Sequence, residues 1–214
     1  MISSIYSKID DGHHLRGQTL FPKTMKVTRQ QAGANRARVL RLASRRFCER
    51  GFRGVSVADL MNEAGLTHGG FYKQFASKED LIRQACALGL RENLAGYQQL
   101  AAEGRRQPLR SIADGMLSAL HRDVPAEGCV IAALGPDISR ADPSTRHEVT
   151  QGIENIVTSL SELIPGKSKA KKREKALAMY ATIVGSVMLT RAVDKPELSE
   201  EILKAARARI MAGT

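Results

Sequence analysis

The segment from Val55 to Leu81, VSVADLMNEAGLTHGGFYKQFASKEDL, constrains the fold more than any other part of the chain. Ser56 and Ser77 each stand three residues before an aspartate, where a serine hydroxyl accepts a hydrogen bond from a free N–H of the first helical turn. Gly65 falls where the first short helix must end, because glycine adopts the left-handed conformation at little cost. Thr67, two residues on, is placed to cap the next helix. The segment therefore predicts two short helices at a tight turn, followed at once by a third.

The rest of the chain is also helical in pattern. Apolar residues recur at helical spacing from about Thr28 to Arg50, and Gly51 then ends that helix. A longer helix is expected from Ser77 to about Leu100. Beyond Gly104, prolines and glycines divide the chain into further helices, which we place near 108–122, 128–135, 143–163, 168–192 and 197–212. No segment alternates as a β-strand does, so the predicted fold class is all-α.

The chain divides into three parts. Residues 1–25 show no sustained period, and we expect a loose N-terminal extension there. Residues 26–81 form a first domain, since five of the nine aromatic residues fall in this region and can build a small core. Residues 82–214 form a second, helical domain. One hypothesis is that Met25, and not Met1, is the natural start.

Positive charge is concentrated toward the N-terminal end. The formal net charge is +11, and residues 26–80 carry eleven Lys or Arg against five Asp or Glu, whereas residues 81–214 carry nineteen against fifteen. Such a gradient suits a polyanion, because each neutralised phosphate releases counterions and adds affinity. A generally basic protein surface explains the same charge, so charge alone does not identify the partner.

The cysteines favour a reducing compartment. Cys48, Cys86 and Cys129 are too few and too scattered for a disulfide framework, and none forms a C-x-x-C pair. No apolar run approaches the roughly 20 residues needed to cross a bilayer, and the first 25 residues lack a secretory signal. We therefore expect a cytoplasmic protein without a membrane span. Oxidant sensing by Cys86 or Cys129 stays open, although free cysteine is usually buried.

Enzyme chemistry finds little support in the sequence. His121 and His147 fall in separate expected helices with no nucleophile motif nearby. Glycine-rich phosphate loops are missing, and the adjacent His13 and His14 have no partners at metal-ligand spacing. We expect no enzyme activity, no cofactor and no metal.

The helix expected near 168–192 is apolar nearly all round after its basic beginning. A helix of this kind packs against its own domain on one side and a partner chain on the other, or it is buried inside a larger bundle. The apolar stripe of the last helix, near 197–212, can pair with it across a two-fold axis. The pattern favours a homodimer through these two helices over simple burial.

The run from Gly65 to Leu81, GLTHGGFYKQFASKEDL, resembles the signature of the tetracycline-repressor (TetR/AcrR) family of transcriptional regulators. The resemblance covers residues 29–81 and includes an arginine-rich first helix and an E-R-G-F turn; beyond residue 81 only the layout is similar. It implies an N-terminal helix-turn-helix DNA-binding domain and a C-terminal ligand-binding and dimerisation domain. A homodimer then reads a pseudo-palindromic operator on double-stranded DNA, with recognition helices about 34–36 Å apart. An unknown small-molecule effector changes this separation, and repression is the expected sign of regulation.

The resemblance also implies a set of DNA contacts. The expected residues are Ser56, Thr67, His68, Gly69, Tyr72, Lys73 and Lys78. Hydroxyls and lysines in this set approach phosphates, whereas His68 and Gly69 face base edges. Many family members carry lysine in place of His68, so a direct contact to guanine is less certain here. Helix capping alone for Ser56 and a solvated charge for each lysine are the alternatives.

Two adjacent glycines are unusual inside a recognition helix. Gly69 and Gly70 together cost roughly 2 kcal/mol of helix propensity relative to alanine, which indicates a backbone that must come close to something such as a DNA groove. Packing that simply tolerates them is the alternative. Phe71 and Phe75 lie four residues apart and are expected to face the small core.

No motif identifies the effector. Tyr97, Met116 and Cys129 are candidates to line its pocket, although each fits a core position equally well. The alternatives to a ligand-responsive regulator are a redox-responsive regulator using Cys86 or Cys129, a basic all-α interaction module that docks to an acidic partner, and a sequence-blind architectural DNA-binding protein.

Overall fold

The structure is a computed structural model that describes residues 28–213. The expected extension over residues 1–25, the hypothesis on Met25 and the pair His13 and His14 all lie outside the described residues.

Every regular element in residues 28–213 is helical, which confirms the all-α expectation. The α-helices are α1 (Arg29–Arg50), α2 (Val57–Glu63), α3 (Lys78–Glu103), α4 (Pro108–Met116), α5 (Ala119–Asp123), α6 (Val130–Ser139), α7 (Pro143–Leu163), α8 (Lys169–Ala192) and α9 (Pro196–Gly213). Two short 3-10 elements, η1 (His68–Gly70) and η2 (Pro125–Glu127), complete the set.

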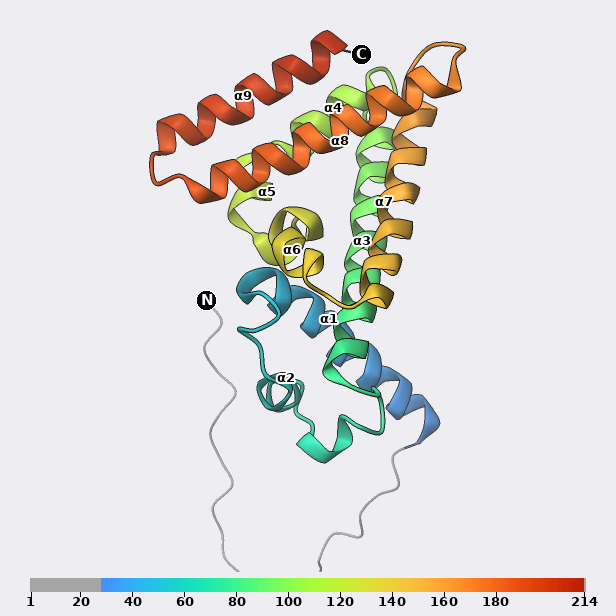
Figure 1. Ribbon diagram of the computed structural model, residues 1–214, viewed down its shortest axis with the longest axis vertical. Helices are drawn as coiled ribbons and strands as arrows, with labels where there is room; N and C mark the ends of the chain where they lie inside the picture. Colours follow the sequence, from blue (N-terminus) through green and yellow to red (C-terminus); the bar gives the residue numbers. More distant parts are fainter. Residues whose placement is uncertain (1–27, 214) are drawn as a thin grey trace, which may run out of the picture.

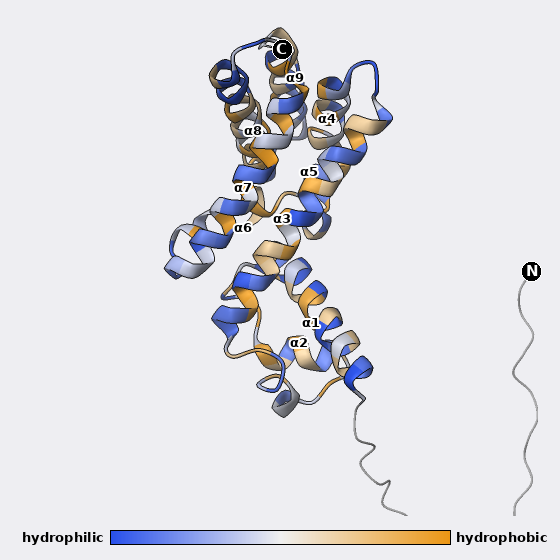
Figure 2. Ribbon diagram, turned by 90° about the vertical axis from the view of Figure 1, so that its right-hand side faces the viewer, coloured by the Kyte–Doolittle hydropathy of each residue, from blue (hydrophilic) through white to orange (hydrophobic). Residues whose placement is uncertain are grey.

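The helices form a small lower unit and a larger upper bundle (Figure 1). The lower unit contains α1, α2 and η1 together with the beginning of α3. The continuous helix α3 then runs upward beside α7, and α8 and α9 cross the top of the molecule. Hydrophobic and hydrophilic residues occur along the same helices, as amphipathic packing requires (Figure 2).

Hydrogen bonds fix the helix ends of the lower unit where the sequence predicts them. Thr28 forms a capping box with Gln31, and Ser56 and Ser77 each accept the N–H of the aspartate three residues on, at 3.0 and 3.1 Å. Gly51, with a φ of 69°, ends α1 by donating its N–H to the Phe47 carbonyl at 2.8 Å. These local bonds confirm the predicted boundaries of α1, α2 and α3 at this end of the molecule.

Two predicted boundaries in the upper bundle are wrong. The helix expected over 108–122 breaks after Met116, because Ser118 caps a new helix by accepting the His121 N–H at 3.2 Å. The helix expected over 128–135 runs on to Ser139 with Pro136 inside it. Pro136 fits because the residue before it is Gly135, which has no Cβ to clash with the proline ring.

Close packing joins the lower unit to the upper bundle. The Ser44 hydroxyl of α1 donates to the Ala85 carbonyl of α3 at 3.2 Å, and a Cβ at Gly89 would lie 2.5 Å from Val130 of α6. On the surface, Arg45 of α1 pairs with Glu127 of η2 at 2.7 Å. The end of α1 is thus packed against both α3 and the α5–α6 connection.

Helix α8 has two apolar faces. One face packs inside the bundle through residues that include Met179, Tyr180, Ile183 and Val187, and the other leaves Leu177, Met188 and Leu189 exposed. The apolar stripe predicted on α9 is likewise partly buried within the chain and partly exposed. Ala206 and Ile210 are buried within the chain, where α9 packs on α8, whereas Leu198 is 42% exposed.

Candidate nucleic-acid interface

The turn between α2 and η1 has the geometry that its glycine predicts. Gly65 adopts a φ of 65°, and its N–H binds the Asn62 carbonyl at 2.9 Å. The next N–H, of Leu66, binds the Met61 carbonyl at 2.8 Å, so the carbonyls of Met61 and Asn62 near the end of α2 are satisfied. This turn directs the chain from α2 into the segment expected to read DNA.

The segment from Thr67 to Phe75, called the recognition segment below, does not form the α-helix that the sequence predicts. Residues His68–Gly70 form a 3-10 turn, in which the Phe71 N–H binds the His68 carbonyl at 3.1 Å. Thr67 stands at the N-cap position with extended backbone, but its side chain makes no capping hydrogen bond. The two glycines explain the loss of regular helix, because glycine has the lowest helix propensity after proline.

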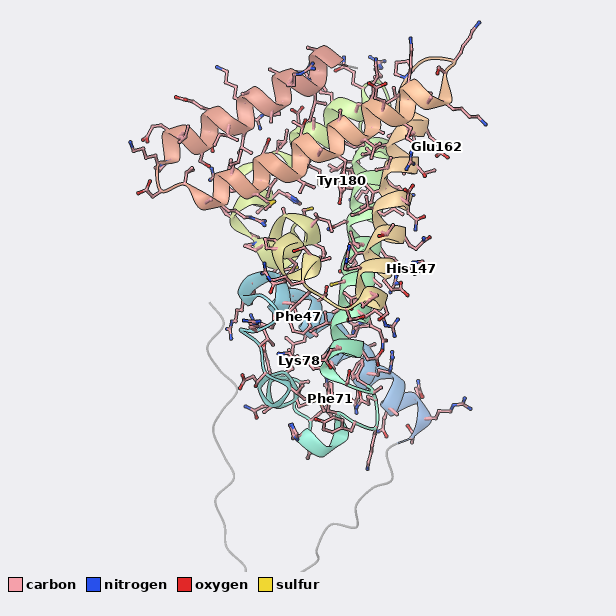
Figure 3. The ribbon with its side chains drawn as sticks, viewed as in Figure 1. Phe47, Phe71, Lys78, His147, Glu162 and Tyr180 are labelled. Carbon is pink, nitrogen blue, oxygen red and sulfur yellow. The ribbon has the colours of Figure 1, made fainter. Side chains whose placement is uncertain are left out.

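The segment presents opposite sides to the core and to solvent. Phe71 and Phe75 are buried and stack with centroids 5.4 Å apart, and Phe47 of α1 belongs to the same lower core (Figure 3). The exposed side carries Thr67, His68, Gly69, Tyr72 and Lys73. Tyr72 is 63% exposed, so most of its ring faces solvent on this side.

His68 and Tyr72 form one exposed aromatic pair. Their rings lie 6.0 Å apart in an edge arrangement, and the Tyr72 ring also contacts Phe71 edge-on at 5.1 Å. Buried Phe71 therefore orients the exposed rings. Lys73 lies beside this pair in the sequence and is exposed, whereas Lys78 is half-buried in the first turn of α3.

The Ser56 hydroxyl forms its hydrogen bonds with Asp59, in the first turn of its own helix. Its hydroxyl accepts the Asp59 N–H at 3.0 Å and also donates to the Asp59 carboxylate at 2.7 Å. The hydroxyl proton is therefore already used, and a phosphate contact from Ser56 requires that it leave Asp59.

Neither adjacent glycine is required by the fold itself. A Cβ at Gly69 would meet nothing within 4 Å, and at Gly70 it would make only ordinary contacts, 3.5 Å from Thr67 and 3.6 Å from Met61. Neither residue has a positive φ. Packing and backbone conformation within the chain therefore give no reason for glycine at these positions.

Arg36 supports the recognition segment, a role that the sequence does not reveal. Its guanidinium lies 4.9 Å from the Phe75 ring centroid and donates to the Gln74 carbonyl at 3.2 Å. The same group reaches Gln84 of α3 at 2.6 Å, and Gln84 in turn donates to Asp80. Arg36 thereby ties α1 to both the end of the recognition segment and the start of α3.

The candidate pocket residues lie in the upper bundle. Tyr97 and Cys129 are each 2% exposed, and both are near Tyr180, whose ring centroid is 6.3 Å from that of Tyr97. Figure 3 labels Tyr180 in the upper bundle. Met116 is partly buried, with its methyl group 3.9 Å from where a Cβ at Gly96 would stand. The structure thus brings Tyr97 and Cys129 together and places Met116, at the end of α4, against α3 near Gly96.

The three cysteines are free and buried. Burial raises the pKa of Cys48 and Cys86 to about 12, and it also raises the pKa of Cys129. A thiolate is the reactive form of cysteine, so burial works against redox sensing by Cys86 or Cys129.

Within residues 28–213, no group of three or more His, Cys, Asp or Glu side chains is arranged to hold a metal ion. Among the same residues, no helix combines the length and apolar character that crossing a bilayer requires.

Comparison with known proteins places the strongest similarity on this lower unit. Residues 39–85 match the sequence profile of the family described as "Bacterial regulatory proteins, tetR family". The HTH-type transcriptional repressor KstR2 of Mycobacterium tuberculosis is 40% identical over 52 residues, 24% of this chain and 26% of the repressor. The HTH-type transcriptional regulator YfiR of Bacillus subtilis is 33% identical over 69 residues, 32% of this chain and 34% of the regulator. The chain thus spans about a quarter to a third of the length of these curated relatives.

Solved structures extend the similarity to the whole fold. The reduced form of NemR from E. coli has a TM-score of 0.70 at 19% identity, covering 83% of this chain and 95% of NemR. A TetR family transcriptional regulator from Cytophaga hutchinsonii has a TM-score of 0.72 at 17% identity, covering 85% and 96%. At these identities the likeness concerns the fold alone.

Proposed function

We propose that this chain, which belongs to the tetR family of bacterial regulatory proteins, is a DNA-binding transcriptional regulator that reads a pseudo-palindromic operator as a homodimer. It is a regulator and not an enzyme. We propose that it represses transcription and that binding of a small-molecule effector releases it from its operator. The relatives named as repressors support that sign.

The exposed side of the recognition segment is the observation that carries the proposal. Thr67, His68 and Tyr72 lie together on a surface that the buried rings of Phe71 and Phe75 hold in place. We assign His68 and the Gly69 backbone to base edges in the major groove, because polar side chains and close backbone approach suit base readout.

Phosphate contacts fall to the hydroxyls and lysines around this surface. We assign them to Ser56, Thr67, Tyr72, Lys73 and Lys78, all within the proposed DNA-binding domain of residues 26–81. The uncapped Thr67 hydroxyl supports this role, because a capping bond does not occupy it. Phosphate contacts of this kind position the protein on the duplex without reading its sequence.

The exposed apolar face of α8 and α9 supports the homodimer. Leu177 is 44% exposed, Met188 is 37% exposed and Leu198 is 42% exposed, although all three are large apolar side chains. Leu177 and Met188 lie eleven residues apart, which is three helical turns, and therefore share one side of α8. A second copy related by a two-fold axis covers such a face with its own, so we place dimerisation in residues 82–214.

Selection of bound fragments from genomic DNA tests the proposal, with salt titration and sedimentation of the same full chain. We expect a dimer that prefers its operator over random duplex by at least about 10³-fold. Six to ten phosphate contacts predict a loss of roughly 10³–10⁵ in affinity between 50 and 200 mM salt. Equal affinity for random duplex indicates an architectural protein, and no DNA binding at low salt indicates a protein-interaction module; either result rejects the proposal.

A further inference from the structure

Helices α8 and α9 form an antiparallel hairpin at the top of the molecule (Figure 1). Near the turn of this hairpin, the Ser199 hydroxyl of α9 donates to the Thr190 carbonyl of α8 at 3.5 Å. Toward the other end, Met179 of α8 and Ile210 of α9 line the same cleft. The last turns of α9 therefore lie beside the first half of α8.

Charge changes sign from one end of this hairpin to the other. Residues 167–175, at the start of α8, carry six Lys or Arg against one Asp or Glu, and residues 204–213 of α9 carry three against none. We call these two stretches the basic end. Residues 194–201, at the turn and the start of α9, carry four Asp or Glu against one Lys, and we call them the acidic end.

Part of this charge is already paired inside the chain. Arg173 of the basic end pairs with Glu154 of α7 at 2.8 Å. Glu200 of the acidic end pairs with Arg122 of α5 at 2.9 Å. Other exposed side chains of the two ends form no ion pair among residues 28–213, and they include Lys175, Glu197, Glu201 and Arg209. Both ends therefore keep charge that a partner can meet.

The basic end contains an open cleft between α8 and α9. The cleft has a volume of about 340 Å³, and the buried side chains of Met179 and Ile210 form its floor. Exposed Lys175 and Arg209 line its rim together with one acid, Glu174. An apolar floor inside a mostly basic rim suits an apolar side chain that is flanked by carboxylates.

The acidic end carries a side chain of that kind. Leu198 is 42% exposed, although it is a large apolar residue. Glu197 and Glu201 lie one residue before it and three residues after it on α9, so both carboxylates stand beside Leu198 on the same side of the helix. The acidic end therefore matches the cleft at the basic end in both shape and charge, but the two lie at opposite ends of one hairpin.

A two-fold axis can bring these ends together between two copies of the chain. Both lower units meet one duplex only if the axis runs along the molecule, from the upper bundle toward the lower unit. The hairpin lies across that direction (Figure 1). A half-turn about the axis therefore reverses the hairpin, so that the acidic end of each copy faces the basic end of the other.

We propose that the α8–α9 hairpin binds the hairpin of a second copy in this antiparallel register, with the acidic end of each copy on the basic cleft of the other. Leu198 enters the cleft of the second copy, and the glutamates beside it meet Lys175 and Arg209 there. This inference rests on the homodimer of the proposed function and adds its direction and its contacts.

The charges select the register more than they add affinity. An exposed ion pair contributes little by itself, because water and salt screen it. A register that places like ends together is penalised twice, since both pairs of ends then repel each other. The exposed apolar side chains of α8 supply the affinity in either register, so charge decides between the two.

Sedimentation analysis of the full chain tests this register through charge reversal. Glu197→Lys combined with Glu201→Lys should weaken self-association by more than tenfold, because two basic ends then meet. Lys175→Glu combined with Arg209→Glu should weaken it by a similar factor. The second variant lowers the net charge and so reduces general repulsion between copies, which would by itself strengthen association.

Recovery of the dimer is the decisive measurement. A chain with all four substitutions has the net charge of the original protein and exchanged ends, so it should self-associate within a few fold of the original. An equal mixture of the two double variants should likewise form mixed dimers, because each supplies the charge that the other has lost. Arg105→Glu combined with Arg106→Glu, at exposed positions outside the hairpin, matches the second variant in charge and should leave self-association unchanged.

The register is rejected if either double variant dimerises as tightly as the original chain, or if neither the fourfold variant nor the mixture recovers the dimer. With a dimeric original chain, these results leave the proposed regulator standing and place its dimer contacts in another register. A monomeric original chain that binds no operator rejects the proposed function itself and the register with it.

Discussion

At the scale of single residues, a substitution at Gly69 should affect folding stability and DNA binding in different ways. Gly69→Ala adds a methyl group that meets nothing within 4 Å of the chain, so the free energy of unfolding should stay the same or rise by about 0.5–1 kcal/mol. Operator binding should fall by tenfold or more if the groove needs this backbone close. Urea denaturation and fluorescence anisotropy measure the two effects. Gly96→Ala on α3, where a Cβ would make only an ordinary contact of 3.9 Å with Met116, is the control and should leave operator binding intact; equal binding by both variants removes Gly69 from the interface.

His68 and Lys78 should affect DNA binding in different ways. Lys78→Ala should weaken binding to all sequences and reduce the slope of log affinity against log salt by about one, because one phosphate contact is lost. His68→Ala should relax the preference at one base position while the salt slope changes little. Binding to a set of single-base operator variants at several salt concentrations distinguishes these outcomes. A uniform loss across all operators from both variants would contradict the role assigned to His68.

At the scale of helices, the exposed side of α8 should decide the oligomeric state. Leu177→Glu combined with Met188→Glu places two charges on one face, which a dimer would have to desolvate without partners. We expect a folded monomer in sedimentation analysis and a large loss of operator affinity, because two half-sites are no longer bound together. Leu120→Glu, at an exposed leucine outside α8 and α9, is the matched control. A double variant that remains a dimer places the interface elsewhere.

Helix boundaries were predictable from the sequence where neighbouring residues determine them. Ser56, Ser77 and Gly51 act through hydrogen bonds within their own turn, so a single sequence is enough to locate them. The recognition segment was predicted as an α-helix but forms a 3-10 turn, since the balance between weak glycine propensity and burial of Phe71 depends on packing. Arg36 was missed because its partners lie 38 and 48 residues away, beyond any local pattern.

The buried polar groups of the upper bundle were only partly predictable from the sequence for the same reason. Tyr97 and Cys129 were candidates, but His121 on α5 and Tyr180 and Arg191 on α8 share no motif. What unites them is the set of polar atoms left unpaired on burial, and only the folded arrangement reveals it.

At the scale of the whole molecule, His121 should make stability depend on pH. Burial, assisted by Arg191, lowers the pKa of His121 from 6.5 to about 4 in the folded chain. Below pH 6.5 the unfolded chain takes up a proton that the folded chain refuses, so stability falls as the pH drops from 6.5 toward 4. We expect a loss on the order of 1–3 kcal/mol over this range, measured by denaturant unfolding at pH 7.5 and pH 4.5. His121→Gln should show a smaller pH dependence; an identical dependence would show that His121 is not the group responsible.

Helix α3 belongs to both parts of the molecule, since its first turn borders the recognition segment and its last turns lie inside the upper bundle (Figure 1). Its 26 residues make a rod about 39 Å long. Pivoting such a rod by about 5° at one end carries the other end through about 3 Å, nearly the 3.4 Å step between stacked base pairs. A pivot of α3 that is too small to disturb the core around Tyr97 is therefore enough to move the two recognition segments of a dimer out of register with their half-sites.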